Sequence, residues 1–354
     1  MTPLKYKKWI DCVERLPATG ETRIHKLRLD KNERTIPFEA NFIGDVLSSI
    51  ESDHLCAYPE VLPFYNQLAE HLGLTAESLF LTSGSDAAIR HCFDLFVNPG
   101  DKVVVLEPTF AMVDVYCQLY AADRSSVGYD VDLEIDYDDM VSRLDDNTSL
   151  VIIANPNSPT GTYIPHDELS KILVKSDELG VPVLIDEAYH GFCKNSALSL
   201  LRDHQNLMIS RTFSKAYGLA GLRIGFLAGN TALMQLVQKL KPMYEVNQMG
   251  ILFASKLLED WSIVDSYIND SEAGKRWLVD ELRLLGFDVI NTETNFIHVD
   301  FGSRLEKILS SFRANEILVR GGLSVVGYEN FLRITTGPLE SMERVIKVVN
   351  EAIS

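Results

Sequence analysis

Short apolar runs alternate with longer amphipathic segments along the chain from about residue 80 onwards. The apolar runs are rich in β-branched residues and cover residues 102–106, 149–154, 181–185, 207–210 and 224–228. Their length and composition predict buried strands, and the segments between them, such as 86–96 and 165–179, have helical periodicity. Pro165 opens the second of these helices and Gly180 ends it. This alternation predicts an α/β fold whose parallel sheet carries helices on both faces.

The pattern changes in the last third of the chain. Residues 231–285 are mostly helical in their periodicity, and after Gly286 short strands are predicted at 288–289, 296–299, 318–319 and 331–335. This mixture predicts a second, smaller α+β domain. We therefore expect a large domain over residues 46–245, and a small domain formed by residues 246–354 together with an N-terminal arm of residues 1–45.

The charge balance limits the kinds of partner that the protein can have. The 354 residues include 50 acidic and 33 basic side chains, which gives a formal net charge of −17. Such a surface repels polyanions, so nucleic acid and anionic membranes are not expected as partners. A small anionic ligand would need a local cluster of arginines and backbone N–H groups, and the chain must supply that cluster at one place.

The cysteines and the N-terminus narrow the class of protein further. The five cysteines are scattered and form no C-x-x-C pair, so we expect neither a disulfide framework nor a metal site. The first residues lack the apolar core of a signal peptide, and no run approaches the roughly 18 apolar residues of a membrane span. We therefore expect a cytoplasmic protein.

Chemically active residues follow several of the predicted strands. Residues 155–161 (NPNSPTG), 186–189 (DEAY) and 211–215 (RTFSK) come directly after three of the runs, and residues 82–86 (TSGSD) open a helix. Ligands of an open parallel sheet bind beyond the carboxyl ends of its strands. These four segments are therefore expected to meet at one site.

In these segments the sequence resembles the fold-type I aminotransferases, which depend on pyridoxal 5'-phosphate, and among them the histidinol-phosphate aminotransferase family. The resemblance runs from about Leu29 to Arg333, and its most specific part is residues 211–225, RTFSKAYGLAGLRIG. It implies an α/β fold with a mostly parallel seven-stranded sheet in the large domain and a smaller α+β domain. It also implies a homodimer with its active sites at the interface.

The resemblance assigns roles around the cofactor ring. Lys215 matches the lysine that holds pyridoxal phosphate as a Schiff base, a use that suits a lysine at the end of a buried strand because burial disfavours the ammonium form. Asp186 matches the acid that pairs with the pyridine nitrogen, and Tyr189 the donor to the phenolic oxygen. Asn157 is expected at the same oxygen. Many relatives have a second Asn where this chain has Ser158, so Asn155 is an alternative to Asn157 for that contact.

Other residues match the contacts to the cofactor phosphate and to the ring face. Ser85 and Asp86 begin a helix, whose free N–H groups and dipole favour an anion, so Asp86 is expected to offer its main-chain N–H. The remaining members of this cofactor group are Thr212, Ser214 and Arg223 at the phosphate, Phe110 on the face of the ring, and Tyr58, which would reach the phosphate of the neighbouring subunit.

Two arginines and an asparagine form the predicted substrate site. Arg333 matches the arginine that binds the substrate α-carboxylate, because a planar guanidinium suits a carboxylate bidentately. Arg320 falls where the family holds a substrate phosphate, although Gly321 and Gly322 follow it here instead of the usual Asp. Asn32 is expected to close over the same site.

The predicted function is therefore transfer of an amino group between glutamate or 2-oxoglutarate and a small keto compound. Imidazole-acetol phosphate, dihydroxyacetone phosphate and an aromatic keto acid remain candidates for that compound. A pyridoxal-phosphate-dependent decarboxylase of the threonine-phosphate type shares nearly the same motifs, and a regulator that binds the cofactor without catalysis is a second alternative. A nucleotide-binding protein is disfavoured because no G-x-G-x-x-G or Walker loop is present.

Overall fold

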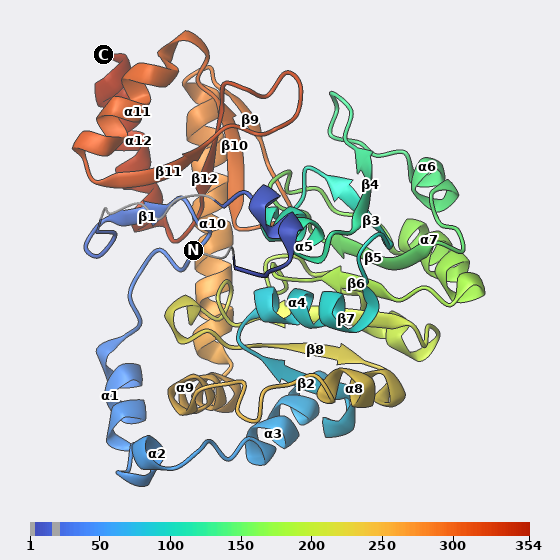
Figure 1. Ribbon diagram of the computed structural model, residues 1–354. Helices are drawn as coiled ribbons and strands as arrows, with labels where there is room; N and C mark the ends of the chain where they lie inside the picture. Colours follow the sequence, from blue (N-terminus) through green and yellow to red (C-terminus); the bar gives the residue numbers. More distant parts are fainter. Residues whose placement is uncertain (1–3, 16–21) are drawn as a thin grey trace.

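The computed structural model describes residues 4–15 and 22–354, so residues 1–3 and 16–21 of the predicted N-terminal arm lie outside it. Two sheets of different size organise the chain (Figure 1). A seven-stranded sheet lies in the lower part of the view and a five-stranded sheet in the upper part, and helix α10 (Ser262–Leu284) runs alongside both. No helix among the described residues is long and apolar enough to cross a membrane.

The larger sheet has the strand order β2-β8-β7-β6-β5-β3-β4. Strands β7, β6, β5, β3 and β4 run parallel to one another, whereas β8 is antiparallel to both β7 and β2. This confirms the mostly parallel seven-stranded sheet. The strands are β2 (Leu79–Thr82), β3 (Lys102–Glu107), β4 (Asp123–Gly128), β5 (Thr148–Ala154), β6 (Val183–Asp186), β7 (Leu207–Thr212) and β8 (Gly225–Gly229).

Helices cover both faces of this sheet, as the alternation of elements predicts. Along β5, Leu150 and Ile152 pack into one hydrophobic cluster with α4, α5 and α8, while Val151 and Ile153 pack into another with α3, α6, α7 and α9. The strands are therefore apolar on both faces, which is why they stand out in the sequence as continuous hydrophobic runs. These helices are α3 (Leu62–Leu72), α4 (Ser85–Phe96), α5 (Ala111–Tyr120), α6 (Tyr137–Ser142), α7 (His166–Leu179), α8 (Thr231–Gln238) and α9 (Gln248–Glu259).

All five predicted runs of the larger sheet form strands, but two further strands do not stand out in the sequence. Strand β4 has the sequence DRSSVG, and Val127 is its one buried residue. It lies at the edge of the sheet, where a polar face is tolerated, so it lacks the apolar pattern of its neighbours. Strand β2 is only four residues long.

The smaller sheet has the order β1-β11-β12-β10-β9 and mixes one parallel pair with three antiparallel pairs. Its strands are β1 (Leu27–Leu29), β9 (Asp288–Ile290), β10 (Phe296–Asp300), β11 (Ile317–Gly321) and β12 (Phe331–Thr335), flanked by α11 (Leu305–Ala314) and α12 (Leu339–Ile353). The four predicted strands after Gly286 are all present. Strand β1 brings the N-terminal part of the chain into this sheet, beside residues near position 318.

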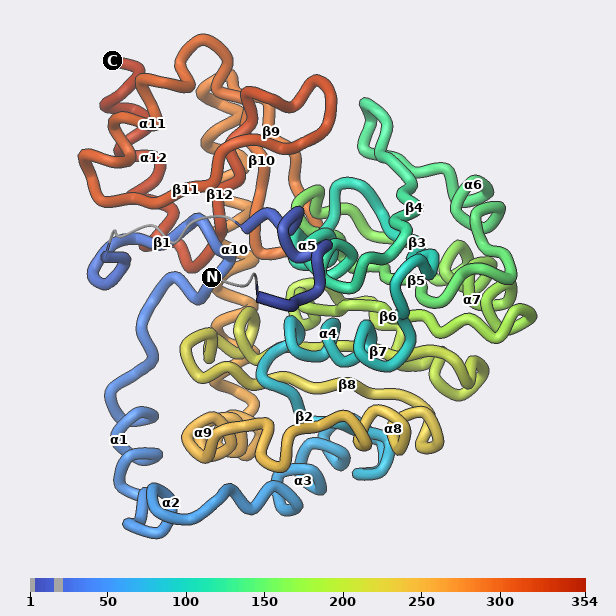
Figure 2. The backbone as a smooth tube through the Cα atoms, viewed as in Figure 1, coloured from blue at the N-terminus to red at the C-terminus, as the bar shows by residue number. Residues whose placement is uncertain are grey.

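The N-terminal segment connects the two parts of the molecule. Figure 2 shows the chain passing from β1 along α10 to α1 (Ala40–Ser48) and α2 (Asp53–Cys56), next to the larger sheet. Before it, Trp9 donates a hydrogen bond from Nε1 to the Leu119 carbonyl at 2.9 Å, so residues 4–15 pack on α5. The segment therefore contacts both parts of the fold.

The two parts also share α10. Val264 and Ile268 in its first half belong to the hydrophobic cluster of the larger sheet, and Leu278 and Leu282 in its second half belong to the cluster of the smaller sheet. Helix α9 packs with the larger sheet as well, through residues such as Ile251. We therefore propose that the division between the domains lies within α10 rather than at residue 246.

Candidate active site

The carboxyl ends of three neighbouring parallel strands meet at one edge of the larger sheet. The register places Ala154 of β5, Asp186 of β6 and Ser210 of β7 side by side, and Lys215 follows β7 by three residues. The three segments that follow these strands therefore begin at the same edge of the sheet: 155–161, 186–189 and 211–215. This is the arrangement that the strand-end argument predicts.

Asp186 is a buried carboxyl group that accepts a short hydrogen bond from a serine. The Ser210 hydroxyl donates to its Oδ1 at 2.6 Å, and the side chain is 4% exposed. Burial raises the pKa of Asp186 to about 6, and the nearby Glu187 adds to this, while the Ser210 bond acts against it. A cationic ring nitrogen placed beside this carboxyl would stabilise its charged form.

Lys215 lies at the centre of the site with its amine on a backbone carbonyl. Its Nζ donates to the Lys31 carbonyl at 2.7 Å and lies 5.8 Å from the centre of the Tyr189 ring. Burial lowers the pKa of Lys215, and the charge of Arg333 lowers it further. An amine whose pKa is lowered in this way reaches its neutral, nucleophilic form more easily.

Tyr189 is held by groups from the small sheet. Asn32 donates from Nδ2 to the Tyr189 hydroxyl at 2.7 Å, and Phe296 meets the tyrosine ring edge to face at 5.5 Å. Asn32 in turn bonds Thr335 at the end of β12. The structure thus places Asn32 against Tyr189 rather than free above the site.

A concave group of donors surrounds the start of α4; we call it the phosphate cradle and define it as Gly84, Ser85, Thr212, Ser214 and Arg223. Gly84 is the N-cap of α4, with φ 86°, and no side chain caps the helix, so its first N–H groups are free for an anion. The Arg223 guanidinium donates from Nη1 to the Ser214 hydroxyl at 3.1 Å. Thr212 donates to the same hydroxyl at 2.9 Å.

The cradle is so tight that only glycine fits at its base. A Cβ built on Gly84 would lie 2.5 Å from Nη2 of Arg223, and one on Gly225 would lie 2.9 Å from the Gly84 Cα. Asp86 turns its carboxylate away, because Oδ1 accepts a hydrogen bond from the Tyr116 hydroxyl at 3.1 Å. Its main-chain N–H lies in the first turn of α4, beside the cradle.

These groups fit pyridoxal phosphate. The cradle offers a permanent charge, three hydroxyls and a helix N-terminus, which is the donor set that a phosphate needs. A buried acid and an amine with a lowered pKa lie at the neighbouring strand ends. This is the cationic cluster that the acidic chain requires to bind an anion.

The two asparagines of the loop of residues 155–161, which the sequence predicts as alternatives for the contact to the phenolic oxygen of the cofactor, form hydrogen bonds within the protein. Both amide hydrogens of Asn157 are used, since Nδ2 donates to the Pro108 carbonyl at 2.9 Å and to the Thr160 hydroxyl at 2.8 Å. Asn155 is also engaged, because its Oδ1 accepts from the Ile164 N–H and its Nδ2 donates to the Ile164 carbonyl. The partly exposed Ser158 hydroxyl faces Arg333 at 3.5 Å.

The two predicted substrate arginines come from adjacent antiparallel strands. Arg320 of β11 and Arg333 of β12 are direct cross-strand partners, so their side chains leave the same face of the sheet. Arg333 donates from Nη2 to the Asp30 carbonyl at 2.8 Å, and its buried Nε has no partner among the residues that the structure describes. Arg320 is exposed. The charge of Arg320 adds to burial in lowering the pKa of Arg333.

Phe110 and Tyr58 are two further aromatic residues predicted near the cofactor. Phe110 is the N-cap of α5, directly after β3, and is partly buried against the cluster formed by α4, α5 and α8. Tyr58 is 70% exposed and lies flat on Tyr244, with 3.8 Å between the ring centres.

The sequence assigns no role to several residues that support the site, although Arg211 and Glu187 lie within the strand-end segments. Arg211 is fully buried and pairs with Glu187 at 2.9 Å, beneath the strand ends that carry Lys215 and Asp186. His298 is buried opposite Arg333 on the neighbouring strand, and its Nε2 lies 2.8 Å from the Pro159 carbonyl. Burial lowers the pKa of His298 to about 4, so the ring is neutral. Only long-range pairing reveals these partners.

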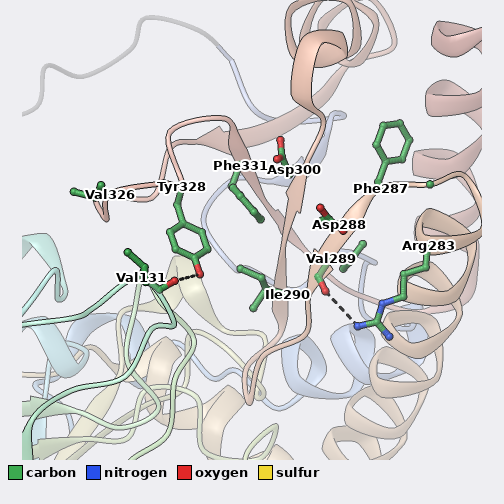
Figure 3. A pocket seen from close by; sticks show the side chains of 12 residues that line it. Val131, Arg283, Phe287, Asp288, Val289, Ile290, Asp300, Val326, Tyr328 and Phe331 are labelled. Atoms are coloured by element: carbon green, nitrogen blue, oxygen red, sulfur yellow. Dashed lines mark hydrogen bonds between the residues drawn. The ribbon is translucent and has the colours of Figure 1, made fainter.

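An open groove lies away from this chemistry. At one end of it, Tyr328 donates a hydrogen bond to the Val131 carbonyl at 2.7 Å (Figure 3). The groove holds about 850 Å³ and is lined by residues of the β9 edge, of the loop between β11 and β12, and by Val131, and none of the predicted site residues lines it. Tyr328 thereby ties the loop that joins the two arginine strands to the larger part of the molecule.

Comparison with known proteins shows which family the chain belongs to. The sequence profile of the family described as aminotransferase class I and II matches residues 31–349. The chain is 30% identical over 333 residues to a histidinol-phosphate aminotransferase of Thermoanaerobacter sp. (strain X514), with 93% of each chain covered. It is 31% identical over 334 residues to histidinol-phosphate aminotransferase 1 of Carboxydothermus hydrogenoformans, again with 93% of each chain covered.

Solved structures show the same fold at lower sequence identity. The histidinol-phosphate aminotransferase from Sinorhizobium meliloti in complex with pyridoxal-5'-phosphate superposes with a TM-score of 0.82 at 22% identity, over 92% of this chain and 90% of that chain. The enzyme from Clostridium acetobutylicum superposes with a TM-score of 0.81 at 21% identity, over 91% and 97% of the two chains. The chain belongs to the class I and II aminotransferase family, as a pyridoxal-phosphate-dependent enzyme of the histidinol-phosphate aminotransferase type.

Proposed function

We propose that this aminotransferase moves an amino group between glutamate or 2-oxoglutarate and a small phosphorylated keto compound. The histidinol-phosphate and imidazole-acetol-phosphate pair is the first candidate, because the relatives at about 30% identity carry that name. A small phosphorylated ketone such as dihydroxyacetone phosphate is the second. The observation that carries the proposal is the pair of arginines on one face of the small sheet.

Two guanidinium groups on directly opposite residues favour a doubly charged ligand. Arg320 and Arg333 repel each other unless an anion lies between or beside them, and a phosphate monoester carries close to two negative charges at neutral pH. In the other half-reaction, glutamate would place its α-carboxylate on Arg333. An aromatic keto acid has only one such charge, so this arrangement favours it less.

We propose that the cradle binds the cofactor phosphate. Asp186 would pair with the ring nitrogen, and Lys215 would attach to the aldehyde carbon. When bound, pyridoxal phosphate supplies an aldehyde that condenses with amines and a ring that accepts the electrons left on the substrate α-carbon. Lys215 would take the proton from the α-carbon at Nζ, because burial favours its neutral form. Asp186 would keep the ring nitrogen protonated, and Tyr189 would donate to the phenolic oxygen.

Ser158 is the member of the 155–161 loop that we propose for a contact at the ligand. Both amide hydrogens of Asn157 are engaged within the protein, so Asn157 supports the loop. The Ser158 hydroxyl is partly exposed and faces Arg333. A hydroxyl of this kind can donate to the cofactor or to a substrate anion.

We propose that the functional unit is a homodimer. Large apolar side chains are exposed on the segment from α1 to α3 and on the loop before α9: Leu47, Leu55, Tyr58, Leu62, Met243 and Tyr244. Tyr58 of the first stacks on Tyr244 of the second. Exposed apolar patches of this kind mark protein interfaces. Tyr58 lies in this patch, as expected if it reaches the neighbouring subunit. Sedimentation of the purified protein would test it, and a stable monomer would contradict it.

The proposed substrate class is tested by truncating each arginine in turn. Loss of a charge-assisted contact costs about 1.5–3 kcal/mol. Arg320→Ala should therefore lower kcat/KM for the phosphorylated acceptor by roughly ten- to a hundredfold. The half-reaction with glutamate should fall less. Arg333→Ala should damage both half-reactions, because Arg333 is the more buried of the two.

Arg344 provides a matched control. It is an exposed arginine on α12, away from the site, so Arg344→Ala should leave both half-reactions unchanged. Equal, small effects of Arg320→Ala on phosphorylated and unphosphorylated acceptors would contradict the proposal. In that case an unphosphorylated keto acid becomes the better substrate class. Release of CO₂ from an amino acid in the same assay would instead indicate the decarboxylase alternative.

A further inference from the structure

Three consecutive residues after β1 each hold one functional side chain. The Asp30 carbonyl accepts a hydrogen bond from Arg333 at 2.8 Å, and the Lys31 carbonyl accepts one from Lys215 at 2.7 Å. Asn32 donates from its side chain to the Tyr189 hydroxyl at 2.7 Å. Asp30 and Lys31 make their contacts through backbone carbonyls, whereas Asn32 uses its side chain. A substitution at Asn32 can therefore remove its contact.

Asn32 is fixed from three sides by the small sheet. Its N–H donates to the Thr335 hydroxyl at 3.0 Å, that hydroxyl donates to Asn32 Oδ1 at 3.0 Å, and Asn295 donates to the Asn32 carbonyl at 3.2 Å. The residue is 2% exposed and has φ 57°, a left-handed conformation that asparagine tolerates better than most residues. Its amide nitrogen is thus left pointing at one atom, the Tyr189 oxygen.

The chemistry of the amide gives this contact a direction. A hydroxyl oxygen accepts the Asn32 hydrogen, so the proton of the Tyr189 hydroxyl must point elsewhere. Hydrogen bonds in a chain also polarise one another, which makes the hydroxyl a better donor. Asn32 therefore leaves Tyr189 oriented to donate.

We propose that Asn32 is a positioning residue that turns the Tyr189 proton toward the phenolic oxygen of the cofactor. Thr335 extends this chain of hydrogen bonds to the end of β12, two residues after Arg333. The strand that holds the substrate anion thereby also sets the hydroxyl that acts on the cofactor. This inference rests on the proposed place of Tyr189 beside the cofactor.

The experiment measures the pH at which the absorbance of the bound cofactor changes in the holoenzyme. Tyr189→Phe removes a donor to the phenolic oxygen and should raise this midpoint by about one pH unit, a tenfold change in the proton equilibrium. Asn32→Asp keeps the shape but replaces the donor by an acceptor, which turns the tyrosine proton away from the cofactor. It should raise the midpoint by a similar amount, and the double variant should raise it no further.

Two substitutions at Thr335 test the anchor. Thr335→Val keeps the shape and removes the hydroxyl that fixes Asn32, so it should shift the midpoint in the same direction by a smaller amount. Thr335→Ser restores the hydroxyl and should behave like the unsubstituted enzyme. Equal midpoints for the Val and Ser variants would overturn the role of Thr335 in the proposal.

Unfolding of the apoprotein gives a readout that needs no cofactor. Asn32→Gly removes the side chain without straining the left-handed backbone. Combined with Tyr189→Phe, it should lower Tm by about 2 °C less than the sum of the two single effects, because both remove the same bond. Asn206→Ala, at an asparagine that bonds the Val181 carbonyl, is the control and should be additive with Tyr189→Phe.

Two outcomes separate this inference from the proposed function. If Tyr189→Phe shifts the midpoint and Asn32→Asp changes only the KM for substrate, Asn32 binds substrate and the positioning role is overturned. If Tyr189→Phe itself leaves the midpoint unchanged, the proposed place of Tyr189 fails, and the inference fails with it.

Discussion

The proposed cofactor side and the proposed substrate side of this site are built in different ways. On the cofactor side, Lys215, Asp186 and the cradle come from residues 84–223, at the ends of neighbouring strands in one sheet. On the substrate side, Arg333 and Thr335 bond residues 30 and 32, which lie 303 positions away in the sequence. One side is a product of local motifs, and the other exists only when the two ends of the chain meet.

The two sides also hold their polar groups differently. The cradle is rigid, with a glycine that no other residue could replace without displacing Arg223, and its hydroxyls are mutually hydrogen-bonded. Arg333 instead rests on a backbone carbonyl at 2.8 Å and a serine at 3.5 Å, and its Nε has no partner in the described part of the chain. A resident cofactor suits the first arrangement. An exchanging substrate suits the second, because weakly engaged donors can change partners.

The largest expected effect lies at the residue that both sides share. Lys215→Ala should lower the rate of either half-reaction by roughly 10⁴-fold, because the group that moves the α-proton is lost. After borohydride treatment the unsubstituted enzyme should carry the cofactor on the peptide that contains Lys215, by mass spectrometry. Lys31→Ala is the control, since it keeps the carbonyl that Lys215 bonds. Cofactor attached to another lysine would refute the assignment.

Asp186→Ala should have the next largest effect and should spare substrate binding. Loss of the buried acid should slow α-proton removal by roughly 10²- to 10³-fold, as removal of one preorganised electrostatic contact does elsewhere. Stopped-flow absorbance of the half-reaction with glutamate would measure it. Because the substrate arginines are untouched, the apparent affinity for glutamate should stay within about threefold. A near-normal rate would mean that Asp186 has a structural role.

Gly84→Ala should weaken the cofactor and leave substrate selectivity unchanged. The new Cβ would displace Arg223 and strain a backbone at φ 86°, so the affinity for pyridoxal phosphate should fall about ten- to a hundredfold. Equilibrium dialysis of the apoprotein would measure this. Gly221→Ala is the matched control, because a Cβ there meets open space. Equal affinities of the two variants would contradict the cradle.

The smallest expected effect is on the pH dependence of apoprotein stability, which should differ between the two sides. Burial lowers the pKa of His298 to about 4, below its ordinary value of 6.5, so the unfolded chain binds a proton that the folded chain refuses. This contribution to stability is lost as pH falls from 6.5 toward 4. When the pH is lowered from 6.5 to 5, the free energy of unfolding of the His298→Gln apoprotein should therefore fall by about 2 kcal/mol less than that of the unsubstituted apoprotein. Urea unfolding at the two pH values would measure this.

Asp186 should give the opposite slope in the same experiment. Burial raises its pKa to about 6, from 3.8, so the folded apoprotein keeps a proton that the unfolded chain has released. Stability from this group is present below pH 3.8 and is lost as pH rises through about 6. Asp186→Asn should remove this fall in the free energy of unfolding with rising pH. Parallel slopes for the two variants would contradict the assignment of opposite electrostatics to the two sides.

Much of the cofactor side could be predicted from the sequence. The apolar runs before Asp186 and Lys215 predict buried strands, and parallel strands bring their carboxyl ends to one edge. The free start of α4 follows from Gly84 and the helix after it. The residues of this side are therefore specified by short segments, and each segment carries its own chemistry.

The substrate side and its support could be predicted only in part. Arg320 and Arg333 are visible as residues, but their direct opposition depends on the register of β11 and β12. The partner of Asn32 is a tyrosine 157 positions away, and the engagement of Asn157 with Pro108 depends on how two loops pack. Strand β4, with its polar sequence at an edge, could not be detected at all.

The sequence by itself determined the fold class, the family and the chemical groups of the cofactor side. These depend on periodicity and on contiguous motifs, which act over a few residues. The tertiary structure alone decided which side chains share hydrogen bonds, such as Asn32 with Tyr189 and Arg211 with Glu187. It also decided how far burial shifts the pKa of Asp186 and His298. Such properties depend on neighbours far apart in the chain, and only packing brings those neighbours together.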